Sequence, residues 1–317
     1  MTTIYLLFFT STLSMILGYI YVYLWNRSSL KKNVPTGYGF LLILFFIVFS
    51  FFTNDNIYLY LLILFLASIY WIDDLLSLSA TIRFTIQFLS GVLIGSFIIF
   101  NQISEINTFT LTLIIFSGLL NIFLTNVINF YDGLDLNLST LILIFVFICI
   151  LFLSDNKELY SSAIILMGFI LGFSIYNYKP NFLYFGDSGC FVLASLITYY
   201  IIGSLAQLSF DFIYLLMVFS LPILDVSYVL ALRVILKENL LSRNYLHLYH
   251  RVFFITNNKM YLINQIFNTS LIILVYYIFV YFNFDSIFAV ILSSLIVTPI
   301  FYFTFRQVFF VKNTQNG

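Results

Sequence analysis

Long apolar stretches separated by short polar breaks run through the chain from end to end. An α-helix needs about 20 mostly apolar residues to cross the hydrocarbon core of a bilayer. The break between the second and third stretches is only Asn54-Asp55-Asn56, and the third stretch is short. The pattern predicts about eleven helical spans, at residues 3–25, 37–53, 57–72, 82–100, 109–125, 139–154, 160–177, 189–206, 209–236, 260–282 and 286–311.

Composition supports a membrane protein and excludes a soluble one. Hydrophobic residues make up 62% of the chain and charged residues 8%, whereas soluble domains have about 45–50% apolar and about 25% charged residues. The apolar N-terminal stretch has no basic segment before it and is too long for a signal peptide, so we expect a retained first span. A net charge of zero gives no attraction to nucleic acid. Cys149 and Cys190 are expected to be buried small hydrophobes.

The basic residues predict the orientation. If the loops after odd-numbered spans share a side with the C-terminal tail, that side carries 12 of the 13 basic residues, and only Lys157 lies opposite. Basic loops stay in the cytoplasm, which places the N-terminus outside and the C-terminus inside. The sequence therefore predicts an all-α, polytopic transmembrane helical bundle forming one domain, 1–317. Its cytoplasmic loops are 26–36, 73–83, 126–138, 178–188 and 237–259.

Five aspartates stand on these cytoplasmic loops, in three compact sets. Either they form a hydrated solvent-facing surface, or they build a site for a cation and phosphate. Mg²⁺ prefers carboxylate oxygens and bridges to substrate phosphates, and charges near lipid must be paired or metal-bound. Their neighbours are glycine, asparagine or a helix start rather than a run of charges. The aspartates are Asp73 and Asp74, Asp132 and Asp135, and Asp187.

Glycines and basic residues on the same side suggest how phosphate would be bound. Gly133 and Gly186 each adjoin an aspartate, and the helix N-termini after such turns could offer N–H groups to phosphate oxygens. Both histidines of the chain lie in one segment, SRNYLHLYHRV. They are either surface residues or bind phosphate together with basic residues of these loops, among them Lys31, Lys32, Arg83, Arg243 and Arg251.

The order of these motifs resembles a known family. An aspartate pair, then NxxNxxDGLD, then GDSG, then a basic loop with histidines is similar to the polyprenyl-phosphate N-acetylhexosamine-1-phosphate transferases. That family includes the phospho-MurNAc-pentapeptide translocase and the enzymes that initiate common antigen, teichoic acid and O-antigen. The likeness runs from the first span to the ninth loop. It implies a bundle of ten or eleven spans with its active site on the cytoplasmic face.

The resemblance also implies roles for individual residues. Asp73 and Asp74 would lie near the metal and the lipid phosphate, with Asp187 and Asp74 as metal ligands. Asn126, Asn129, Asp132 and Asp135 would bind nucleotide and sugar diphosphate. Tyr184 would lie against uracil. Phosphate and substrate contacts would come from Lys31, Lys32, Thr36, Arg83, His247, His250 and Arg251, and Pro222 with Asp225 resembles a PxxD motif of the ninth span.

The reaction so implied joins UDP-N-acetylhexosamine to undecaprenyl phosphate, with Mg²⁺ or Mn²⁺ as cofactor, in a bacterial inner membrane. The product lipid would initiate a cell-surface glycan, and UMP would leave. All five aspartates are candidates for catalytic roles; one could orient the lipid phosphate, and a covalent nucleophile is the weaker alternative. A homodimer is one option for the assembly. The ninth loop reads HLYHR rather than HxHH, which leaves the sugar open.

Other classes fit the sequence less well. A secondary transporter would bury charges near the membrane midplane and often shows internal repeats. Here only Asp225 falls well inside a predicted span, and no repeat is visible. A CDP-alcohol phosphotransferase needs DGxxAR, whereas this chain continues Gly133-Leu134-Asp135. A purely structural subunit does not explain five converging acids.

Overall fold

The computed structural model describes residues 3–27, 34–53, 57–76, 78–102, 107–152, 157–239 and 245–311. Across these ranges every regular element is a helix, and none is a strand. The chain divides into two compact units, Met1–Phe210 and Asp211–Gly317, each with its own packing. The all-helical prediction is confirmed.

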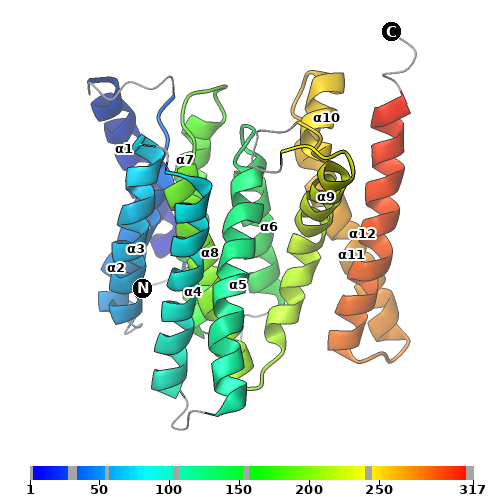
Figure 1. The fold of residues 1–317 in the computed structure, drawn as a ribbon, viewed down its shortest axis with the longest axis horizontal. Coiled ribbons are helices and arrows are strands. Elements are labelled where there is room, and N and C mark those ends of the chain that lie inside the picture. Colours follow the sequence, from blue (N-terminus) through cyan, green and yellow to red (C-terminus); the bar gives the residue numbers. More distant parts are fainter. Residues whose placement is uncertain are drawn as a thin grey trace. The chain divides into compact units, whose positions relative to one another are not determined.

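The N-terminal unit contains eight α-helices and one 3₁₀ helix among its described residues (Figure 1). They are α1 (Thr3–Arg27), η1 (Tyr38–Phe40), α2 (Leu41–Thr53), α3 (Ile57–Leu76), α4 (Ala80–Gln102), α5 (Thr108–Tyr131), α6 (Asn137–Phe152), α7 (Lys157–Asn177) and α8 (Gly186–Ala206). The described part of the C-terminal unit contains η2 (Asp211–Leu215), α9 (Leu216–Ile235), α10 (Leu248–Thr256), α11 (Tyr261–Tyr281) and α12 (Ser286–Val311).

Every predicted span coincides with a helix. Among the described residues, nine helices are long and apolar enough to cross a membrane, and two shorter apolar segments, Tyr38–Phe51 and Asn137–Phe152, occupy the second and sixth predicted positions. The span count of eleven and the orientation of the termini stay predictions. The hydropathy pattern missed α10, because it has nine residues and lies within the polar ninth loop.

Helix α8 is the core of the N-terminal unit. It packs against α3, α4, α5 and η1, and most of its residues are buried. Helices α4 and α5 approach closely at Gly91, which has no Cβ. A Cβ there would lie 2.3 Å from the carbonyl oxygen of Ser117. The Ser117 hydroxyl donates to the Gly91 carbonyl at 2.7 Å. Small residues at such crossings, with a hydroxyl bond between helices, are typical of membrane bundles.

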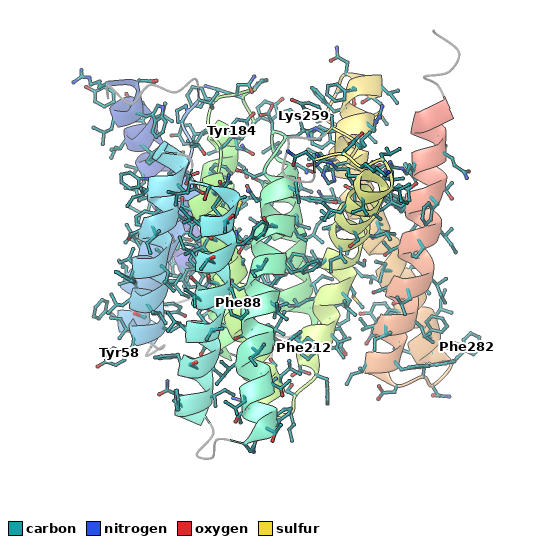
Figure 2. The ribbon with its side chains drawn as sticks, viewed as in Figure 1. Tyr58, Phe88, Tyr184, Phe212, Lys259 and Phe282 are labelled. Carbon is teal, nitrogen blue, oxygen red and sulfur yellow. The ribbon has the colours of Figure 1, made fainter. Side chains whose placement is uncertain are left out.

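Large apolar side chains cover the outside of this unit. Tyr5, Phe8, Tyr58 and Phe65 are each more than 60% exposed, as suits surfaces that face lipid rather than water. Tyr58 and Tyr184 mark opposite ends of the unit (Figure 2). At the Tyr184 end, helices α1, α3, α5 and α7 end and helix α8 begins (Figure 1). The loops that carry the predicted acids therefore gather at one end of the unit.

The C-terminal unit is held together by α9, α11 and α12. Helix α9 packs against both α11 and α12, and α10 lies against the same two helices. Polar side chains tie these helices inside the unit: Thr269 donates to the Met217 carbonyl at 3.2 Å, and the hydroxyls of Thr298 and Ser220 are 2.9 Å apart. Hydroxyl bonds of this kind are favourable between helices away from water.

Candidate active site

The start of α8 is held by a carboxylate from another helix. Asp74, near the end of α3, accepts hydrogen bonds from the Asp187 N–H at 2.9 Å, the Ser188 N–H at 3.1 Å and the Ser188 hydroxyl at 2.6 Å. The residue before α8, Phe185, makes no side-chain cap of its own. The first N–H groups of a helix have no partner within it, so Asp74 caps α8 from α3.

A second carboxylate holds the turn just before Asp187. Asp132, which follows α5 directly, accepts from the Gly186 N–H at 2.8 Å and the Phe185 N–H at 3.4 Å. Burial raises the pKa of Asp132 to about 7; the two N–H bonds lower the pKa, and the charges of Asp187 and Asp74 raise it further. Gly186 has φ +86°, and a Cβ there would lie 2.2 Å from the Gly37 nitrogen. Glycine is therefore required at this turn.

These bonds correct one expectation about phosphate binding. The N–H groups of Gly186, Asp187 and Ser188 were expected to be available to phosphate oxygens, as at other helix N-termini. In the structure Asp132 and Asp74 already accept hydrogen bonds from all three. The start of α8 is thus a fixed platform for the Asp187 side chain.

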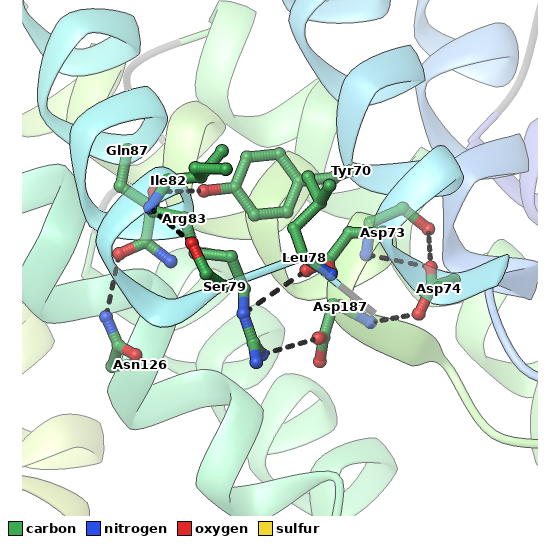
Figure 3. A network of polar contacts seen from close by, with 11 residues as sticks. Tyr70, Asp73, Asp74, Leu78, Ser79, Ile82, Arg83, Gln87, Asn126 and Asp187 are labelled. Carbon is green, nitrogen blue, oxygen red and sulfur yellow. Dashed lines mark hydrogen bonds and ion pairs between the residues drawn. The ribbon is translucent and has the colours of Figure 1, made fainter. Parts of the chain in front are cut away.

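Arg83 joins two further acids of this end, Asp187 and Asp73. Its terminal nitrogen lies 3.3 Å from the Asp187 carboxylate, and its Nε lies 3.5 Å from the Asp73 carboxylate (Figure 3). The other oxygen of Asp73 accepts from the Leu78 N–H at 2.5 Å, in the turn between α3 and α4. The side chains of Arg83 and Asp187 are 37% and 28% exposed, whereas that of Asp73 is 2% exposed. Arg83 and Asp187 are therefore the ion-paired groups that a ligand can reach.

Three polar residues outside the predicted set support this arrangement. The Tyr70 hydroxyl donates to the Arg83 carbonyl at 2.8 Å. The Gln87 side chain accepts from Asn126 at 2.9 Å, which ties α4 to α5 (Figure 3). The third is Ser188, in the Asp74 cap. Tyr70 lies three residues before Asp73 and Gln87 four after Arg83, so helical spacing was the only sequence signal for them.

Asn126 and Asn129 have different surroundings. The Asn126 amide donates to Gln87 and to its own helix at Ile122. The Asn129 side chain is a hydrogen-bond partner of the Asp187 carboxylate. Asn129 therefore joins the accessible Asp187, while Asn126 braces the helices beneath it.

The first loop lies against the segment that leads into α8. The Tyr184 N–H donates to the Pro35 carbonyl at 3.0 Å, and the Gly39 N–H donates to the Phe185 carbonyl at 2.8 Å. The Tyr21 hydroxyl fixes the Thr36 carbonyl at 2.6 Å. Thr36 thus lies next to Gly186, and its contact with substrate stays a prediction. Lys31, Lys32 and Arg243 lie outside the described residues.

Tyr184 and Asp135 lie on the loops beside the cluster. The Tyr184 hydroxyl donates to the Asn181 side chain at 2.9 Å, and Asp135 is half-buried in the turn between α5 and α6. Their predicted roles stay predictions. Buried Asn177, which the sequence did not single out, ties these loops together: it accepts from the Leu136 N–H at 2.7 Å and donates to the Leu183 carbonyl at 2.8 Å.

The donor set is compatible with Mg²⁺ bound mainly through substrate. In the described parts of the chain, no three His, Cys, Asp or Glu side chains group as a ready metal cage. Mg²⁺ usually takes only one or two carboxylates and completes its shell with waters and substrate phosphates. Partly exposed Asp187 fits that role. Asp74, the other predicted ligand, already accepts three hydrogen bonds at the start of α8.

The histidine segment belongs to the C-terminal unit and is described there by itself. His247 and His250 are only 2% and 5% exposed, while Arg251 is half-buried on α10. Burial lowers the pKa of Arg251, and the charge of Arg306 lowers it further. Two neighbouring guanidinium groups favour an anion between or beside them. That this segment faces the carboxylates stays a prediction.

The N-terminal unit resembles known transferases. Residues 56–205 match the glycosyl transferase family 4 model. The chain is also 29% identical over 168 residues to the "Probable undecaprenyl-phosphate N-acetylglucosaminyl 1-phosphate transferase" of Bacillus subtilis (strain 168). That alignment covers 48% of this chain and 45% of the relative, so less than half of each protein is compared.

The matched region contains Asp73, Asp74, Arg83, Asp132 and Asp187, which together hold and surround the start of α8. The resemblance inferred from the order of motifs is therefore confirmed by an independent match to the region that contains these residues. The residues that build this carboxylate cluster therefore lie within the part of the chain, residues 56–205, that is similar to glycosyl transferase family 4.

Proposed function

We propose that this chain transfers a sugar-1-phosphate from a nucleotide sugar to a polyprenyl phosphate at the membrane surface. One observation carries the proposal: the accessible Asp187–Arg83 ion pair lies at the end of apolar helices, on a platform fixed by Asp74 and Asp132. The family match and the activity for which the Bacillus subtilis relative is named support the same reaction class. UDP-N-acetylhexosamine and undecaprenyl phosphate are the proposed substrates.

In the proposed reaction, an oxygen of the lipid phosphate attacks the phosphorus that carries the sugar. A new P–O–P bond forms, and the bond from that phosphorus to the bridging oxygen of the nucleotide breaks. UMP leaves with both electrons of that bond. A phosphate monoester has a second pKa near 6 and is largely ionised at neutral pH, so the attacking group requires little help from a base.

Catalysis of this kind depends on positioning and charge neutralisation. We propose that Arg83 binds a phosphate oxygen, because its guanidinium is the exposed cation of the cluster. Its contact with buried Asp73 sets the position of the guanidinium, which makes Asp73 a positioning residue rather than the group that orients the lipid. Asn129, bonded to Asp187, would keep that carboxylate in one orientation.

Mg²⁺ is the proposed cofactor, with Mn²⁺ as a substitute. Asp187 would hold it, aided by waters and the diphosphate of the substrate. When bound, the ion would neutralise charge on that diphosphate. The proposal departs from the expected Asp187–Asp74 pair only in giving Asp74 the task of placing Asp187, because three donors of α8 already occupy the Asp74 oxygens.

The test is a transfer assay with purified protein in detergent. It would contain undecaprenyl phosphate, Mg²⁺ and each of several UDP-sugars in turn, with product lipid separated from nucleotide. At least one UDP-N-acetylhexosamine should give a sugar-bearing diphosphate lipid and UMP. EDTA should stop transfer, and added Mg²⁺ should restore it. No transfer from any UDP-sugar by folded protein, or full activity in EDTA, would contradict the proposal.

A further inference from the structure

The C-terminal unit contains a buried polar network that the matched family region does not include. At its centre is Asp225 of α9, a carboxylate with no exposed surface. Its Oδ2 lies 3.1 Å from His247 Nδ1, and its Oδ1 accepts from the Leu248 N–H and the Tyr302 hydroxyl, both at 3.0 Å. A buried carboxylate is costly unless it is paired and hydrogen-bonded. These three partners, from two other segments, meet that requirement.

Helix α12 completes the network through Arg306. Its guanidinium donates to the Tyr302 hydroxyl at 2.7 Å and to the Leu246 carbonyl at 3.3 Å. It also lies over the Tyr228 ring, 4.4 Å from the ring centroid. Arg306 is 6% exposed. A chain of bonds therefore runs from Arg306 through Tyr302 to Asp225 and on to His247.

The network holds three consecutive residues at the start of α10. Leu246, His247 and Leu248 are consecutive and lead into this helix, and the Arg251 N–H donates to the His247 carbonyl at 3.1 Å in its first turn. Because these three residues are held in place, the direction of α10 and the position of Arg251 are set as well. His247 is too deeply buried to be the contact of this segment with a substrate, whereas Arg251 is half-buried.

We infer that Tyr302 and Arg306 are positioning residues, which act through Asp225 and His247 to hold α10 so that Arg251 can bind a phosphate of the substrate. This inference rests on the proposed transferase function for its substrate. It gives His247 a different role from the expected direct contact. The network also explains how the Asp225 carboxylate and the Arg306 guanidinium can both be buried in this unit.

A double-mutant cycle tests whether Tyr302 acts through Arg251. Tyr302→Phe keeps the ring and removes only the hydroxyl that joins Arg306 to Asp225. We expect kcat/KM for the UDP-sugar to fall about tenfold or more in Tyr302→Phe and further in Arg251→Ala. The double variant should be no worse than Arg251→Ala alone, since residues that act as one unit are not additive. Additive losses would overturn the inference.

The control is Tyr228→Phe, which keeps the ring beside Arg306 and leaves the bonds of Asp225 intact. We expect kcat/KM to stay within about twofold of wild type in this variant. An equal loss in Tyr228→Phe and Tyr302→Phe would mean that any change beside Arg306 matters, and would also overturn the inference.

A second measurement does not depend on transferase activity. The chain has two histidines, so ¹⁵N-histidine NMR of the full chain in nanodiscs can be assigned with His250→Gln. The His247 Nδ1–H resonance should report a hydrogen bond to a carboxylate, shift in Tyr302→Phe, and stay unchanged in Tyr228→Phe. An unchanged resonance in Tyr302→Phe would overturn the network. Absent transfer in wild type with a shifted resonance would instead refute the proposed function and leave the positioning of His247 intact.

Discussion

At the scale of single residues, the acids of the N-terminal unit differ in what their oxygens already bind. Asp74 and Asp132 accept hydrogen bonds from the start of α8, and Asp73 accepts from a turn and pairs with Arg83. Asp187 is the partly exposed acid of the ion-paired cluster. The sequence alone does not distinguish these aspartates. Their contacts show that Asp73, Asp74 and Asp132 hold the site together, whereas Asp187 is accessible to a ligand.

This difference predicts that two matched substitutions, which should both reduce transfer, will differ in their effect on stability. Asp187→Asn should abolish transfer and leave the melting temperature nearly unchanged, because Arg83 keeps its contact with Asp73. Asp74→Asn places an NH₂ group among three donors, and an unsatisfied buried group costs about 1–3 kcal/mol. Its melting temperature should fall together with activity. Scanning fluorimetry and the transfer assay on both variants would check this, and equal destabilisation by the two changes would contradict it.

The pKa of Asp132 predicts a pH dependence of stability. Burial raises this pKa from its ordinary value near 4 to about 7 in the folded state, so the folded state prefers the protonated form. The stability linked to this group is complete below about pH 4 and is lost as pH rises through about 7. The variant Asp132→Asn cannot ionise. Its melting temperature relative to wild type should therefore rise between pH 5 and 8; a constant difference would contradict the assignment.

At the scale of elements, η1 and α8 depend on a close backbone approach. A Cβ on Gly39 would lie 2.5 Å from the Gly189 Cα, where neither backbone can give way cheaply. Gly39→Ala should separate the first loop from α8, displace Asp187 and lower both stability and transfer. Gly18→Ala is the control, because the atoms nearest to its Cβ would belong to the Tyr176 side chain and not to backbone. Equal melting temperatures and rates for the two variants would argue against this contact.

Hydropathy predicted the helices well because each span is a local, continuous property of the sequence. The α3 and α8 positions and the aspartates between spans followed from that pattern. The sequence did not predict that Asp74 caps α8, because Asp74 and Asp187 are 113 positions apart and no local pattern indicates the contact. For the same reason, the sequence did not single out Tyr302 and Arg306 on α12, whose partners are distant in sequence. Helix α10 was missed because its nine residues lack the length of a span.

At the scale of the whole molecule, the charge distribution predicts the topology. Twelve of thirteen basic residues fall on one side of the predicted eleven spans, which places Gly317 in the cytoplasm and Lys157 outside. Reporter fusions at these two positions should show that they lie on opposite sides of the membrane. The same side for both would mean that the span count is wrong and that the loops assigned to the active site do not share one face.

In the proposed reaction a phosphate is transferred together with the sugar. This transfer is tested most directly by running the purified protein with undecaprenyl phosphate, Mg²⁺ and a UDP-N-acetylhexosamine labelled with ³²P at either the α or the β phosphorus. We expect the β label to enter the lipid and the α label to leave as UMP, and we expect neither product from Asp187→Asn. If sugar reaches the lipid while both labels remain in UDP, the protein transfers sugar alone, which contradicts the proposed reaction.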